Sequence, residues 1–473
     1  MKSISAFLAL GLVSILTIPV NAANNPHKCT TDQDSPSSGK EITAEGHRLR
    51  RKSGLTYNKD IAPLIIAHCA SCHRPGEVAP FSLLSYSDVR KRASQIVQVT
   101  SRQFMPPWKA DSHGEFEGEN RLTSDQTGLI KQWVDEASPE GDASDLPEPR
   151  TFTPGWRLGP PDAELAPERS FSLGASGGDE FHTFLLPTDF PEDRYLSAVE
   201  VRPGNRAVVH HTIVCVDRSG RFRKLAEESG RMDFSRGFGI PEGVLDVWTP
   251  GKIQERLPRG IGMFLPKGAD VVIEVHYHRT GKPEQDRTKI GLYFCKEPVK
   301  QLLHISGLNA SRLSIAPGDA NYRTDGQMPV LVNATLLSIF PHMHQIGKTM
   351  RVTLTLPDGT QKPLVNVPAW DFSWQNTYRY KEPIKLPRGS TIKMTATYDN
   401  SAANPRNPNT PPKHIDWGEQ TTDEMGLVLF AFTVDNEDLD DLIVRDPVSA
   451  TGREKSGGVR MVGREESRND AHR

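Results

Sequence analysis

The sequence changes character near residues 141–154, and this change limits the folds open to the chain more than any other feature. Before it, residues 60–68 and about 125–137 have the apolar spacing of amphipathic helices. The segment itself carries three prolines and is typical of a linker. After it, short runs rich in Val, Ile, Leu and Thr alternate with Pro, Gly and Asp turns, at 207–216, 270–278, 331–340 and 350–356. The pattern predicts a multidomain chain, with a small all-α domain followed by all-β domains of the sandwich or jelly-roll class.

Both ends of the chain are predicted to lie outside the folded domains. Lys2, an apolar run over residues 7–19 and the small residues before Ala23 are typical of a secretion signal, so residues 1–22 are predicted to be cleaved. The alternative is an uncleaved membrane anchor. Residues 23–54 form a polar, flexible lead-in, and residues 448–473 form a charged, disordered tail. We therefore expect a secreted or periplasmic protein with no membrane span in its mature form.

The net charge of −2 gives no basic field of the kind that nucleic-acid binding requires, so no nucleic-acid partner is expected.

Residues Cys69-Ala-Ser-Cys72-His73 form the C-x-x-C-H pattern that attaches c-type haem. Two thiols this close can both bond to the haem vinyl groups, and the adjacent imidazole then reaches the iron. A thioredoxin-like redox pair and half of a zinc site are the alternatives. Neither explains His73, and the sequence has no second C-x-x-C to complete a zinc site.

Met105 is predicted to be the second axial ligand of this haem. It lies in Phe-Met-Pro-Pro-Trp, where two prolines would stiffen the loop that presents the sulfur. Simple packing of Met105 is the alternative, and His113 is a rival ligand, whereas His68 is too close to Cys69 to reach across the haem. Residues 55–145 resemble a class I cytochrome c domain, and residues 146–165 would link it to the β-rich part.

Three histidine pairs fall on strand-like segments of the β-rich part. Because His342 and His344 are two residues apart, they share a face of a strand and can chelate one ion. Adjacent His210 and His211 can do so only where the strand twists sharply or bulges. The third pair offers either His276 or His278. Imidazole ligands suit copper or zinc, and an added thioether favours copper.

Four motifs resemble those of the ascorbate-dependent copper type II monooxygenases, the family of peptidylglycine alpha-hydroxylating and dopamine beta-monooxygenases. In chain order they are Val-Val-His210-His211-Thr-Ile-Val, Ile-Glu-Val-His276-Tyr, Pro-His342-Met-His344-Gln-Ile-Gly-Lys and Thr-Thr-Asp-Glu-Met425-Gly. The resemblance implies a first jelly roll over 166–315 and a second over 316–447. It implies two copper ions, an electron-transfer copper on His210, His211 and His276 and a dioxygen-activating copper on His342, His344 and Met425.

Two positions depart from the peptide-amidating members of that family. Phe340 and Leu429 stand where those enzymes have an arginine and a tyrosine that bind the peptide carboxylate. A carboxylate buried there would lack a cationic partner, so we expect a less polar substrate than a C-terminal glycine peptide. Glu274 replaces a glutamine of the peptide enzyme and adds a charge near the first copper.

The expected activity is that of a copper-dependent monooxygenase, an oxidoreductase that hydroxylates a C–H bond of a small organic substrate with dioxygen. Electrons would come through the fused haem, from ascorbate or from another external donor, and we expect the haem to reduce the copper of His210, His211 and His276. A non-catalytic haem–copper electron carrier and a degenerate binding module are the alternatives. Cys215 and Cys295 either pair or remain buried thiols, and spacing does not decide between these.

Overall fold

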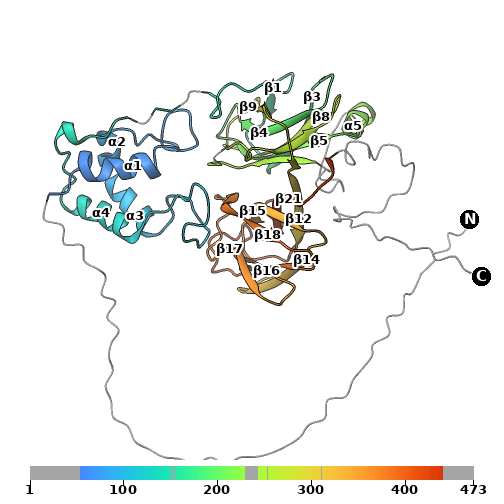
Figure 1. The fold of residues 1–473 in the computed structure, drawn as a ribbon. Helices are drawn as coiled ribbons and strands as arrows, with labels where there is room; N and C mark the ends of the chain where they lie inside the picture. The colour runs from blue at the N-terminus through green and yellow to red at the C-terminus, as the bar shows by residue number, and fades with distance from the viewer. Residues whose placement is uncertain are drawn as a thin grey trace, which may run out of the picture. The chain divides into compact units, whose positions relative to one another are not determined.

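The computed structural model describes residues 54–149, 151–152, 155–229, 243–252, 254–310 and 312–439, which belong to one compact unit (Figure 1). The predicted signal peptide, nearly all of the lead-in and the tail lie outside the described residues. Among the helices that are described, none is long and apolar enough to cross a membrane.

Most of the helices lie before residue 146. Asp60 to His68, predicted as one helix, divides between the π-helical turn η1 (Tyr57–Ile61) and α1 (Ala62–His68). The helix predicted near 125–137 is α4 (Ser124–Asp135), which Thr123 caps through a reciprocal capping box with Gln126. The remaining helices are α2 (Tyr86–Lys91), α3 (Ala93–Ser101), the 3-10 turn η2 (Ala143–Asp145) and α5 (Arg221–Ser229).

The predicted fold class, an all-α cytochrome c domain followed by two all-β jelly rolls, is wrong. The chain is mostly β-sheet and 13% helical, and its described part has five short α-helices and no evident all-α cytochrome domain. The helices share a small core that includes Ile65 and Trp133, but residues 69–85 and 102–123 between them are not helical. Prolines and glycines break the helical periodicity in these segments. Phe116, which lies in the second of them, instead pairs with Tyr380 and is buried in a β-sheet core.

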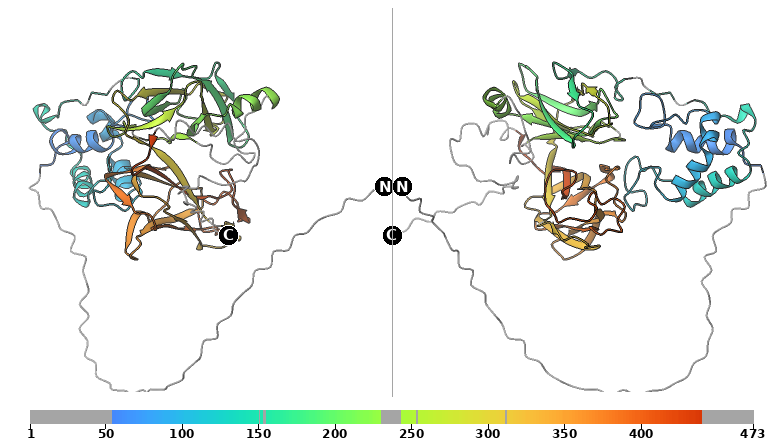
Figure 2. Two further views of the ribbon diagram at one scale, coloured as in Figure 1. Left: turned by 45° about the vertical axis from the view of Figure 1, so that its right-hand side comes forward. Right: turned by 180° about the vertical axis from the view of Figure 1, so that it is seen from behind.

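The first pair of sheets spans residues 163–302 (Figure 2). Alternating apolar residues such as Val214 and Ile273 in one sheet and Leu196 and Leu292 in the other meet in a common core. In spatial order, one sheet contains β3 (Glu180–Pro187), β8 (Asp270–Tyr277), β5 (Val209–Asp217) and β6 (Val244–Trp248). The other contains β1 (Ala163–Leu165), β10 (Lys289–Phe294), β4 (Arg194–Arg202), β7 (Ile261–Leu265) and β11 (Gln301–Leu302), while β2 (Phe171–Leu173) pairs separately with β9 (Glu284–Asp286).

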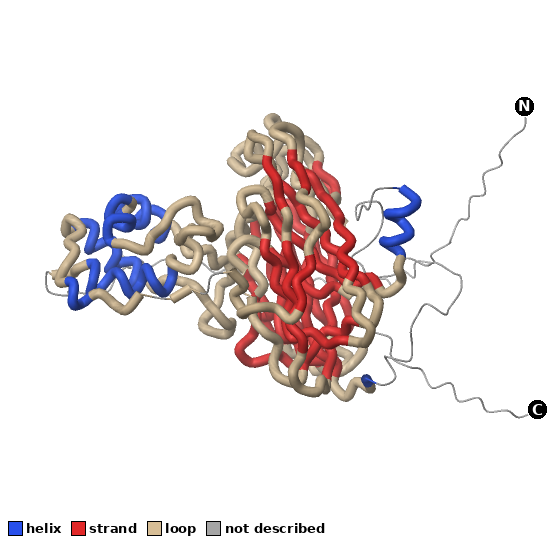
Figure 3. Tube along the Cα trace, turned by 90° about the horizontal axis from the view of Figure 1, so that it is seen from above, coloured by secondary structure: helices blue, strands red, loops and turns tan. Residues whose placement is uncertain are grey.

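The second pair of sheets spans residues 304–434 and encloses a core of its own, which includes Ile339, Val352, Met394 and Phe430. Figure 3 shows the strands of both pairs of sheets in red. One sheet contains β12 (His304–Asn309), β21 (Gly426–Val434), β15 (Ala334–Met343) and β18 (Tyr378–Leu386). The other contains β14 (Tyr322–Pro329), β19 (Thr391–Tyr398), β16 (Gly347–Thr355) and β17 (Gln361–Val367), while β13 (Ser314–Ile315) pairs with β20 (Ile415–Asp416).

Candidate functional site

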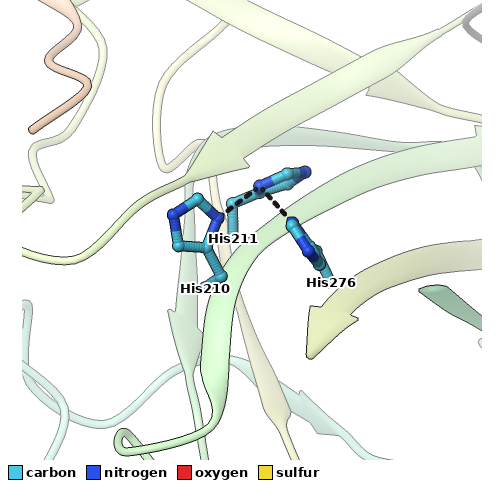
Figure 4. A group of neighbouring side chains, drawn as sticks. All are labelled: His210, His211 and His276. Carbon is cyan, nitrogen blue, oxygen red and sulfur yellow. Dashed lines mark hydrogen bonds between the residues drawn. The ribbon is translucent and has the colours of Figure 1, made fainter. Parts of the chain in front are cut away.

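His210, His211 and His276 form a compact cluster at one end of neighbouring strands β5 and β8 (Figure 4). The register of the two strands shifts between Val209 and His211, and this irregularity lets two adjacent histidines face the same space. The Nδ1 atom of His211 lies 3.2 Å from Nδ1 of His210 and 3.3 Å from Nδ1 of His276. One ring nitrogen from each histidine lies within 4.8 Å of the others, which is the arrangement that a single metal ion requires.

The environment of this cluster favours the neutral form of His210 and His211. Burial, reinforced by nearby His276, lowers the pKa of His210 to about 3, and the same two causes hold the pKa of His211 well below its ordinary value. In a neutral imidazole, Nδ1 is either protonated or a lone-pair acceptor. Three converging Nδ1 atoms therefore cannot all be satisfied by hydrogen bonds to one another. A cation at their centre satisfies the converging lone pairs, so the residues fit a metal ion.

Asp179 fixes the orientation of His276. Its Oδ2 atom accepts a hydrogen bond from Nε2 of His276 at 2.9 Å, which leaves Nδ1 of that ring free for a metal. Burial raises the pKa of Asp179, but hydrogen bonds from His276, Thr421 and His278 outweigh burial and hold it below its ordinary value. His278 reaches the other oxygen of Asp179 at 2.9 Å and its side chain is exposed, so the geometry favours His276 as the third ligand.

We expect an Asp179→Asn variant to bind metal at the three-histidine cluster about 10–100-fold more weakly, because loss of an outer-shell partner has effects of this size. The neutral amide oxygen is a weaker hydrogen-bond acceptor for His276 than the carboxylate is, so the imidazole ring is less firmly oriented. Competition with a chromophoric chelator measures the change. Glu180→Gln is the matched control, since the adjacent Glu180 is bound to Arg279 instead. Equal affinity in Asp179→Asn and the parent protein would contradict this role.

A second cluster lies at the end of β15. His342 lies in β15 and His344 directly follows its last residue, with their ring centroids 5.1 Å apart. The Nδ1 atom of His342 lies 2.6 Å from the Gln375 side-chain oxygen, and Nδ1 of His344 lies 3.2 Å from the Asp423 carbonyl. Because Nδ1 must donate in both contacts, each ring keeps its Nε2 lone pair for a metal. Burial lowers the pKa of His342 to about 4 and that of His344 to about 3.

Met425 lies beside this second cluster. Strands β15 and β21 pair in antiparallel register up to Met343 and Gly426. The backbone N–H groups of the next residues, His344 and Met425, both donate to Oε1 of Glu424, so the backbone of Met425 lies close to that of His344. The set of donors, two imidazoles and a thioether, fits copper and Cu(I) in particular.

Glu424 holds this strand end in place, a role that the sequence pattern did not reveal. Its buried carboxylate accepts from the backbone N–H groups of His344, Ile346 and Met425, the last two at 3.2 and 3.0 Å. Burial raises the pKa of Glu424 to about 8, although these backbone hydrogen bonds act in the opposite direction. The sequence signal was its position directly before the methionine of the fourth motif.

A Glu424→Ala variant is expected to lower the free energy of unfolding by about 3 kcal/mol, because each buried donor left without a partner costs about 1–3 kcal/mol. Denaturant-induced unfolding followed by tryptophan fluorescence measures the loss. The exposed Glu382 provides a control, and Glu382→Ala should leave stability unchanged. Equal midpoints for the two variants would show that Glu424 is not a structural anchor.

Two contacts connect the clusters. One is made by Phe372 and the other by Asp179, and neither residue belongs to the four sequence motifs. The Phe372 ring stacks on His210 with a centroid distance of 4.8 Å and contacts the edge of His344 at 5.9 Å. Asp179, which orients His276, also accepts a hydrogen bond from Thr421 at 2.7 Å, four residues before Met425. The Phe372 ring therefore contacts both histidine clusters.

The C-x-x-C-H residues border a mostly apolar cavity of about 520 Å³. Cys69, Cys72, His73 and Met105 all line it, and both cysteines are free thiols. Nδ1 of His73 donates to the Phe81 carbonyl at 3.2 Å, which leaves Nε2 available as an iron ligand. Burial raises the pKa of Cys69 to about 12. These residues fit a covalently attached haem.

His68 and His113, the alternatives to Met105 as second axial ligand, are placed differently from Met105. His68 lines the cavity but its Nδ1 atom is engaged with Asn120 at 2.8 Å, and His113 is exposed and lies outside the cavity lining. The cavity borders the second histidine cluster, because Phe340 lines it and also stacks on His342 with a centroid distance of 6.2 Å. Cys215 is buried and Cys295 is partly buried, and both are free thiols.

Comparisons with known proteins give no family assignment. No family model and no curated protein matches the chain. Among solved structures, the major capsid protein P2 from Bacteriophage PM2 is 9% identical with a TM-score of 0.24, over 57% of this chain and 97% of its own. A structure of infectious bursal disease virus Gx strain is 11% identical with a TM-score of 0.17, over 58% and 72%. A two-domain protein of unknown function from Bacteroides fragilis is 9% identical with a TM-score of 0.15, over 54% and 94%. Likenesses this weak carry no argument about function.

Proposed function

We propose that the protein is an exported copper-dependent monooxygenase that hydroxylates a C–H bond of a small, uncharged organic substrate with dioxygen. One observation carries the proposal: His210, His211 and His276 converge in one cluster, His342 and His344 form a second, and the Phe372 ring contacts both. When bound there, copper supplies one-electron chemistry and the activation of dioxygen.

The side chains of the chain itself would divide the work as follows. His210, His211 and His276 would hold one copper through Nδ1. His342 and His344 would hold the other through Nε2, and the Met425 thioether would complete that site. Three protein donors leave a position open, as a catalytic metal requires.

The apolar surroundings of the second cluster support an uncharged substrate. Phe340 and Leu429 are directly paired in the register of β15 and β21, two residues along from His342 and Leu427. Both are buried and line the cavity, so a charged substrate group placed there would be desolvated without a partner.

We also propose that a c-type haem attached to Cys69 and Cys72, with His73 and Met105 as axial ligands, supplies electrons, alone or together with ascorbate. Phe340 lines the cavity and stacks on His342. This contact supports transfer of electrons from the haem to the second cluster rather than to His210, His211 and His276. Export follows from the signal-like residues 1–22.

Incubation of the holoprotein with a mixture of small extracellular metabolites under ¹⁸O-labelled dioxygen tests this function. The proposal expects one ¹⁸O atom in a product and dioxygen uptake that depends on the substrate. Uptake of dioxygen or oxidation of the haem with no labelled product would instead identify a haem–copper electron carrier.

A further inference from the structure

The cavity that carries the C-x-x-C-H residues has a second wall made of β-strand residues. Leu245 and Val247 of β6 and Met263 of β7 line it from the first pair of sheets. Ile305 of β12 and Leu429 of β21 line it from the second pair. These five side chains are apolar and buried or half-buried, so they give the cavity an apolar surface beside charged lining residues such as Lys252, Glu255 and Arg379.

The loop that presents Met105 is held by this second wall on both sides. The preceding Phe104 contacts the edge of Trp374, with ring centroids 6.4 Å apart. Two residues after Met105, the Pro107 carbonyl accepts a hydrogen bond from the Asn376 side chain at 2.7 Å. The position of the Met105 thioether therefore depends on the segment 374–376, which leads into β18.

One polar group of the wall lacks a partner. The Trp374 side chain lines the cavity, and its Nε1 atom is buried with no acceptor among the described residues. An unpaired buried N–H costs about 1–3 kcal/mol, so such a group is expected to meet an acceptor on whatever fills the cavity. Haem carries two carboxylate groups that can accept this bond.

We infer that the β-sheet wall is an integral part of the haem site, and that the Trp374 indole N–H binds a haem carboxylate. The inference rests on the proposed attachment of haem at Cys69 and Cys72. It explains why the helical segment is not a closed domain: its helices form only one side of the cavity, and the strands form the other. Water exclusion and hydrogen bonds near the haem set its reduction potential, so residues of the strands should control that potential.

The test is redox titration of the full-length holoprotein, followed by haem absorbance. Ile305→Glu places a carboxylate in the wall and should lower the reduction potential, because negative charge stabilises ferric iron. Trp374→Phe removes the N–H donor together with part of the aromatic ring and should lower the potential as well, since the haem carboxylate then keeps more of its charge. The matched controls are Leu331→Glu and Trp417→Phe, at exposed positions outside the cavity, which should leave the potential unchanged.

The possible outcomes distinguish a failure of this inference from a failure of the proposed haem site. Parent-like potentials in both wall variants, with haem fully attached, would overturn the inference and leave the proposed haem site standing. A parent protein without covalent haem would overturn the haem site itself, and the inference with it. A lowered potential in the two wall variants but in neither control supports the inference. If one of the two wall variants does not fold, Val247→Glu replaces it, and a lowered reduction potential is again the expected result.

Discussion

A His344→Ala variant is expected to lose one of its coppers and to lose substrate-dependent dioxygen uptake, while it keeps its haem. The substitution leaves His342 and Met425 as the only two donors of the second cluster. Loss of an outer-shell partner alone weakens metal binding by about 10–100-fold, and loss of a direct ligand should exceed that, so turnover should fall at least about 100-fold.

Metal analysis of the purified variant and an oxygen electrode measure the two effects. His414→Ala is the matched control, because His414 is half-exposed and its Nε2 atom bonds to Ser314 and Asp416 and not to a residue of either cluster. The three-histidine cluster lies on other strands and should retain its metal. A variant that keeps both coppers and full activity would remove His344 from the site.

The double variant Cys69→Ala/Cys72→Ala is expected to carry no covalent haem. Both proposed thioether bonds require these two thiols, and the proposed ligands His73 and Met105 would hold haem only by coordination. The mass of the intact protein should correspond to the polypeptide alone, and the haem absorbance should disappear after denaturation and extraction. Copper content should not change, because neither histidine cluster contains a residue of this segment.

Cys295→Ala provides the comparison for this loss. Cys295 is a free, partly buried thiol outside the cavity, so its removal should leave the haem in place. Complete covalent haem in the double cysteine variant would mean that the C-x-x-C-H residues do not attach it.

Local sequence patterns predicted individual elements well. The helix predicted near 125–137 corresponds to α4, and the strand runs at 207–216 and 270–278 correspond closely to β5 and β8. These features depend on residues within a few positions of one another, such as the capping box and the alternation of apolar side chains.

The fold class and much of the site depend on long-range contacts that local patterns do not contain. Phe116 joins a core formed by strands of the second pair of sheets, far later in the chain, and this docking is why the helices do not form a separate domain. Asp179 and His276 are 97 positions apart, and Phe372 lies in a loop with no motif of its own. The irregularity at His210 was required for a shared metal, but nothing in the residues themselves fixed its position.

Elemental analysis combined with copper X-ray absorption on the purified holoprotein tests the central claim most directly. The account predicts about two coppers per chain, bound by nitrogen, with a sulfur ligand at one of them in the reduced state. The sulfur signal should vanish in Met425→Ile while the nitrogen signal remains. Zinc in place of copper, or no sulfur near either metal, would contradict the assignment of His210, His211, His276, His342, His344 and Met425 to two copper sites.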